Sequence, residues 1–383
     1  MSPPERLRRT VIGLGLSLTS SAGLPSVPER SRRMLVAWSA STLPVTPLLL
    51  LGMLLGPHGL ALFSPRVLAV LDPAVPVALG ALGILLGFSI PGRAFNRLTA
   101  LAAGAETALT VGIVGLGMVG VTWAAAPSIA SPFWFLPLFG SLCAAASLTL
   151  PGRRGVEPRR LDEALTESEV AMMIVAGGLV VSSVRAGSAA AGLWLFAQAS
   201  GVTMLLAGAG WLLVRDAAGV IETRIFAFAA VLVVGGSADY LSFSALLGGL
   251  AAGLLWNGLG GPACERLQRE TLYAQHPFVV LVLLVAGSRT ELSAVTIGLG
   301  AAYAVIRSFA RILSGAVLWP HLPGITQSLR LRLVDHGIFG VAFALTLNRA
   351  LGAEAALTLS VVVIGTVLSD IMRGLATSRG ADE

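Results

Sequence analysis

A few ionisable side chains lie well inside apolar stretches of the chain, where they could bind or exchange small charged species. Glu106 lies nine residues after Arg97, and Glu169 lies nine residues after Arg160. At 1.5 Å of helical rise per residue, that separation is about 13 Å, a large part of the way to the middle of a ~30 Å hydrocarbon layer. An acid at that depth usually faces a cavity, a partner or a transport path, so both are candidates for binding a proton or a cation.

Each of these residues also has a less specific interpretation. Glu106 could be a neutral carboxyl bonded to a neighbouring helix, and Glu169 could complement the dipole of a helix that starts with several acids. Arg307 could neutralise a buried acid, or it could extend with Arg311 to the cytoplasmic surface. Arginine does not release a proton near neutral pH and the chain contains no lysine, so these basic groups can only be fixed positive charges.

The composition indicates a protein embedded in a lipid bilayer. Of 383 residues, 55% are hydrophobic and 12% are charged, with a mean hydropathy of +0.83. Because soluble domains are about one-quarter charged, a soluble enzyme is excluded, and the net charge of +6 belongs to short loops and not to a nucleic-acid surface. Two cysteines and the lack of a P-loop, metal cluster or nucleophile triad predict no enzymatic activity, no cofactor and no resident metal.

Hydropathy, with proline, glycine and arginine taken as breaks, predicts an all-α protein of about thirteen transmembrane helices. Two of the segments, 223–236 and 276–288, are short for a full crossing, so we expect tilted, broken or half helices there. The predicted spans are 10–27, 38–62, 74–91, 98–122, 130–150, 164–184, 190–214, 223–236, 239–259, 276–288, 292–317, 333–348 and 355–371.

The arginines predict the orientation of these spans, since short cytoplasmic loops carry an excess of them. The loops after the odd-numbered spans hold most of the arginines. Those after the even-numbered spans hold only Arg66, Arg185, Arg289 and Arg349. We therefore expect a multi-pass plasma-membrane protein with a cytoplasmic C-terminus and an outside N-terminus. Three arginines before residue 10 disagree, so the first segment could instead be interfacial or a signal peptide.

Small residues recur at four-residue spacing, which close helix packing in lipid requires. We expect such packing along Gly248, Ala252 and Trp256, and along Gly298, Ala302 and Ile306. The expected parts of the chain are an N-terminal segment at 1–37, a membrane domain at 38–373 and a short cytoplasmic tail at 374–383.

Several motifs occur in the order known from one family of transporters. Residues 43–47 (LPVTP) and 51–60 (LGMLLGPHGL) are followed by 82–88 (LGILLGF) and 244–253 (SALLGGLAAG). Further matching pieces are 276–287, 306–315, 335–345 and 361–370. Over about residues 38–373 the chain thus resembles the monovalent cation:proton antiporter superfamily, the group of sodium/proton and Kef-type potassium/proton exchangers.

The resemblance implies a fold of thirteen helices in two inverted repeats, with a core transport domain and a dimerisation domain. Two broken helices would cross in the core, around 143–148 and 335–342. The protein would be a homodimeric secondary transporter that exchanges Na⁺ or K⁺ for protons by alternating access.

The chain departs from this family at the acids that working exchangers use. The fifth span carries the hydroxyls of Ser147 and Thr149 but no carboxylate. On the sixth span, one register puts Ala171 and Met172 where the family has an Asn-Asp pair, and another leaves Glu169 as the surviving acid. An exchanger needs a carboxylate that binds either a cation or a proton, so that the two compete.

The resulting hypothesis assigns ion or proton binding to five residues and charge compensation to Arg307. The five are Glu106, Glu169, Ser147, Thr149 and Asp335. Asp335 and His336 precede Gly337 at the second helix break, where they could also be a solvated pair. The alternative function is a non-exchanging member of the same fold that acts as a membrane sensor, scaffold or pore.

Overall fold

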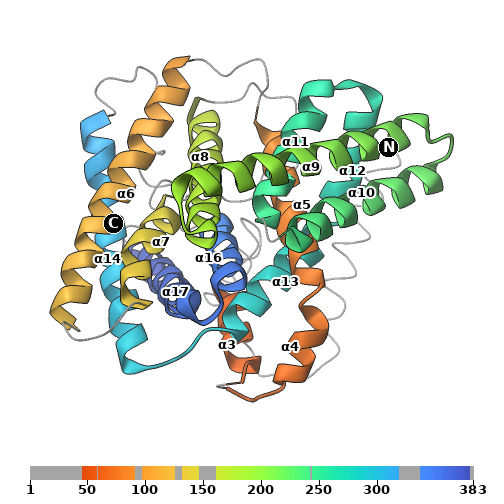
Figure 1. The fold of residues 1–383 in the computed structure, drawn as a ribbon. Coiled ribbons are helices and arrows are strands. Elements are labelled where there is room, and N and C mark those ends of the chain that lie inside the picture. Colours follow the sequence, from red (N-terminus) through yellow and green to blue (C-terminus); the bar gives the residue numbers. More distant parts are fainter. Residues whose placement is uncertain are drawn as a thin grey trace, which may run out of the picture. The chain divides into compact units, whose positions relative to one another are not determined.

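The computed structural model describes residues 45–57, 59–90, 97–125, 132–145, 161–241, 244–318 and 337–379 (Figure 1). These ranges contain helices and no strand, which confirms the predicted all-α class. The helices are α3 (Val45–Leu55), α4 (Pro65–Leu71), α5 (Ala74–Ser89), α6 (Arg97–Ala125), α7 (Pro132–Ala144), α8 (Leu161–Ala186), α9 (Ala189–Asp216), α10 (Val220–Tyr240), α11 (Ala245–Leu259), α12 (Gly261–Tyr273), α13 (Gln275–Ser288), α14 (Ala294–Leu318), α16 (Ile338–Leu351), the 3₁₀ helix η2 (Gly352–Ala355) and α17 (Ala356–Arg379).

Six helical segments of the described chain are long and apolar enough to cross a membrane, or seven if the bent pair α12–α13 counts as one. The chain is therefore a multi-pass membrane protein. Three further apolar helices, α3, α5 and α11, are shorter. The expected first span and the N-terminal segment lie outside the described residues.

The expectation of a short span at 223–236 is wrong, because α10 runs over 21 residues from Val220 to Tyr240. The glycines taken as its end continue the helix. A Cβ at Gly235 would lie 2.8 Å from the carbonyl oxygen of Pro76, so this glycine allows a close approach to α5 and does not mark a break. The break expected near 276–288 is present, since α12 and α13 meet at 49°. Pro277 has no N–H for the carbonyl of Tyr273, which accounts for the interruption.

The helices pack in two groups. The first group consists of α6, α7, α8, α14, α16 and α17, and the second of α3, α5 and α9 to α13. In Figure 1, α6, α7 and α14 lie together on one side of the view, and α9 to α12 on the other. Glu106, Glu169, Arg307 and Arg311 lie on the first group.

The second group depends on glycines that bring helix backbones into contact. A Cβ at Gly83 would lie 2.1 Å from the carbonyl oxygen of Leu246, and one at Gly249 would lie 1.9 Å from that of Gly80. The two glycine-rich motifs at 82–88 and 244–253 therefore pack α5 directly on α11. The expectation for Gly298 is wrong, because no described atom would lie within 4 Å of a Cβ there.

Two helices of the first group are too short to cross a bilayer. α7 has 13 residues and α16 has 14, which is about 20 Å each at 1.5 Å per residue. α7 ends at Ala144 and α16 begins at Ile338, where the resemblance places the two helix breaks. The segments that follow α7 and precede α16 lie outside the described residues, and with them Ser147, Thr149, Asp335 and His336.

The contact between α5 and α11 predicts a sharp difference between two glycines of α11. Gly249→Ala places a methyl group against helix backbone, which cannot rotate away, and overpacking of this kind costs about 1–3 kcal/mol. Gly258→Ala faces open space and should be neutral, or stabilising by up to about 1 kcal/mol, because alanine favours helix. Thermal unfolding of the purified variants in detergent measures both. Equal midpoints for the two variants would contradict the packing described.

Candidate functional site

One face of α14 carries the basic residues of the site. Tyr303, Arg307, Arg311 and Ser314 follow one another at helical spacing, and each is at most 1% exposed. The opposite face carries exposed apolar residues such as Val305, as expected for a helix that faces lipid. Neither arginine reaches a surface, so the interpretation in which the two extend to the cytoplasm is wrong.

Arg311 connects three elements of the first group. Its Nη1 lies 3.1 Å from Oε2 of Glu169 on α8 and 3.5 Å from Oε1 of Glu106 on α6. Its Nη2 donates a hydrogen bond to the carbonyl oxygen of Ala145, just beyond α7. Both glutamates are buried, with at most 1% of their surface exposed. Glu169 therefore does not lie in a solvated helix start, and the two candidate acids meet at one guanidinium.

Arg307 contacts the end of α7. Its Nε donates a hydrogen bond of 3.0 Å to the carbonyl oxygen of Ala144, the last residue of α7. Carbonyls at the C-terminal end of a helix lack intrahelical partners and carry the negative end of the helix dipole. Arg307 thus compensates the end of the half helix, and Arg311 pairs with Glu106 and Glu169. The i, i+4 spacing of the two arginines was the sequence signal for this shared face.

A further acid faces this cluster from α17. Asp370 accepts a hydrogen bond from the hydroxyl of Thr46 on α3 and lies within electrostatic range of Arg307. Glu167, two residues before Glu169, is also fully buried. The sequence around Glu167 and Asp370 does not indicate their contacts, so sequence analysis gave neither residue a role.

The described part of the site contains more carboxyl groups than arginines. Glu106, Glu169 and Asp370 face two fixed positive charges, Arg307 and Arg311. A carboxylate that no arginine neutralises is strongly disfavoured away from water. The arrangement is therefore suited to bind a positively charged species, and protons and metal cations both meet that requirement.

Hydroxyl groups lie one helical turn from Glu106 and Arg311. Thr110 on α6 donates a hydrogen bond of 3.4 Å to Oγ of Ser314, which donates in turn to the carbonyl oxygen of Arg311 at 3.2 Å. These oxygens join α6 to α14 beside the acids. Sequence analysis missed them, because buried serine and threonine in helices usually bond only their own helix backbone.

Comparison with known proteins supports the fold. No family model and no curated protein matches the sequence. Among solved structures, the chain is similar to the sodium proton antiporter MjNhaP1 from Methanocaldococcus jannaschii, with a TM-score of 0.57 and 15% sequence identity. The match covers 95% of this chain and 96% of that one. The chain thus has the fold of a cation:proton antiporter.

The shared guanidinium predicts a large stability cost for Arg311→Met. This change leaves Glu106 and Glu169 buried without their common partner, and breaking a buried ion pair from one side costs about 3–5 kcal/mol. Arg224→Met is the control, because Arg224 is 64% exposed in its pair with Glu270 and such surface pairs contribute about 0–1 kcal/mol. Thermal unfolding in detergent compares the two. Adding Glu169→Gln to Arg311→Met should recover part of the loss, and failure of both expectations would contradict the ion pairing.

Proposed function

We propose that this chain exchanges a monovalent cation, Na⁺ or K⁺, for protons across the plasma membrane. The observation that carries the proposal is that, among the described residues, three carboxyl groups face two buried arginines: those of buried Glu106 and Glu169 and of partly buried Asp370. The similarity of the fold to a sodium proton antiporter supports the same function.

Exchange requires that a proton and a cation compete for one group. Of the two acids at Arg311, Glu106 is held at 3.5 Å and Glu169 at 3.1 Å. Because the interaction of opposite charges weakens with distance, Glu169 remains the partner of Arg311 and Glu106 is the exchanging group. A proton on Glu106 removes the charge that a cation needs, so each ligand excludes the other.

A dehydrated alkali cation also needs neutral oxygen ligands that replace its water. Thr110 and Ser314 offer such oxygens one turn from Glu106. Ser147, Thr149 and Asp335 remain proposed ligands from the two helix breaks.

The division into two groups of helices supports alternating access. The first group carries the charged site, and its movement against the second would expose that site to either side of the membrane. Within this proposal, the second group mediates homodimer formation. The inverted repeats are distributed over both groups of helices. The helix ends that carry most of the arginines face the cytoplasm.

Transport in proteoliposomes tests the proposal. Wild-type protein should dissipate an imposed ΔpH on addition of Na⁺ or K⁺, with Li⁺ as a third cation. Glu106→Gln removes the exchanging group and should reduce the response to that of empty liposomes, and Glu169→Gln should do the same. Glu354→Gln, an exposed acid outside the charged cluster, should behave as wild type.

The proposal is overturned if the wild-type protein does not dissipate the ΔpH on addition of any of the three cations. The chain would then be a non-exchanging member of the fold, acting as a sensor, scaffold or pore. A response that persists in Glu106→Gln but not in Glu169→Gln would move the exchanging role to Glu169.

A further inference from the structure

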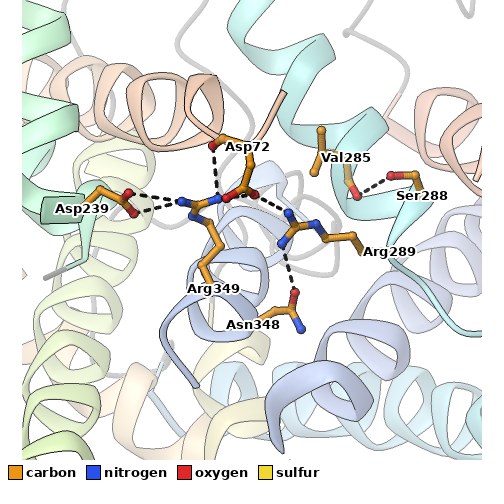
Figure 2. Close-up of polar contacts among 7 residues, drawn as sticks. All are labelled: Asp72, Asp239, Val285, Ser288, Arg289, Asn348 and Arg349. Carbon is orange, nitrogen blue, oxygen red and sulfur yellow. Dashed lines mark hydrogen bonds and ion pairs between the residues drawn. The ribbon is translucent and has the colours of Figure 1, made fainter. Parts of the chain in front are cut away.

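A cluster of ion pairs lies at the helix ends opposite to those that carry most of the arginines. It consists of Asp72, Asp239, Arg289 and Arg349, and we call it the end cluster (Figure 2). Nη1 of Arg349 lies 2.5 Å from Oδ1 of Asp72, and its Nη2 lies 3.0 and 3.3 Å from the two oxygens of Asp239. Nη2 of Arg289 donates to the same Oδ1 of Asp72. Asp72 thus joins both arginines.

The end cluster crosses the boundary between the two helix groups. Arg349 lies in the last turn of α16, in the first group. Its acidic partners belong to the other side, because Asp239 lies in the last turn of α10 and Asp72 lies just before α5. Arg289 ends α13 and donates to Asn348 of α16 at 3.5 Å, as Figure 2 shows. These contacts therefore hold the end of α16 to the ends of α10 and α13 and to the start of α5.

The charge balance of the end cluster differs from that of the buried site. Two acids meet two arginines, and a third arginine, Arg185 of α8, lines the cavity beside Asp239 and Arg349, so no carboxyl is left to require a proton or a cation. The acidic side chains are 38% and 45% exposed, which gives water access to the pairs. A partly exposed ion pair of this kind breaks at a low cost in free energy. Because the charges of the end cluster share partners, the cluster as a whole is stronger than one isolated pair. Such contacts are suited to open and close again.

A small cavity lies next to these contacts. Its volume is about 110 Å³, and Asp239 and Arg349 line it together with Leu79 of α5 and Thr346 of α16. Thr346 lies less than one turn before Arg349 and is 5% exposed. Separation of α16 from α5 would enlarge this cavity toward the end cluster and expose Thr346 to water.

We infer that the end cluster is a latch, which holds α16 on the second group and must open before the first group can move at this end of the molecule. The consequence for transport rests on the proposed exchange function, whereas the latch itself concerns only the contact between the helix groups. On the orientation expected from the arginines, the latch closes the outer side.

Accessibility of a cysteine beneath the latch tests the inference without measuring transport. The reporter is Thr346→Cys in a Cys143→Ala, Cys264→Ala background, and the probe is a water-soluble maleimide applied to purified protein. Asp239→Asn removes one partner of Arg349, and Asp72→Asn removes the shared partner of both arginines. The reporter cysteine should be labelled several-fold faster when either substitution is added than in the reporter protein alone. Labelling should be faster with Asp72→Asn than with Asp239→Asn. Glu354→Gln is the matched control, an exposed acid of η2 near the end of α16.

Equal labelling rates in all variants would overturn the latch. Asp239→Asn keeps the test decisive if Asp72→Asn fails to fold, because Asp239 lies at the exposed rim. The result is also independent of the exchange hypothesis. Faster labelling in a protein that exchanges no cation would support the latch and exclude the exchanger. Unchanged labelling in a protein that exchanges cations normally would exclude the latch and support the exchanger.

Discussion

The burial of Arg307 and Arg311 is the constraint around which the first group of helices is arranged. Removing a guanidinium from water costs several kcal/mol unless its donors find acceptors. Here the acceptors are the carbonyl end of α7, which lacks partners because the helix stops short of a full crossing, and the carboxylates of α6 and α8. The half helix and the charged site therefore stabilise each other, and neither would be tolerated alone in an apolar interior.

The two charged clusters differ in ways that match separate tasks. Among the described residues, the buried site has more acids than arginines and has hydroxyl neighbours, which suits it to bind a positively charged species. The end cluster has partly exposed acids and partners on both helix groups, so water can solvate its charges when the ion pairs open. Direct packing of α5 on α11 through glycines keeps the second group rigid.

Structural similarity to a sodium proton antiporter at 15% identity shows that the fold tolerates extensive change in its residues. The positions that one register matches to the family's Asn-Asp pair hold Ala171 and Met172, and Met172 packs beside Gly104 of α6. Glu106 and Glu169 are the buried acids that meet Arg311 in this helix bundle.

Hydropathy and proline or glycine positions determined the helical class, most helix boundaries and the break before α13, because these depend on local solvation and backbone chemistry. Depth arguments also identified Glu106 and Glu169 as buried acids, since distance along a helix is a local quantity. Sequence could not show that both meet Arg311, that Arg307 closes α7, or that Asp72 joins Arg289 to Arg349. Those contacts join residues 142 to 277 positions apart, and only the packing of helices in three dimensions decides which buried charges become partners.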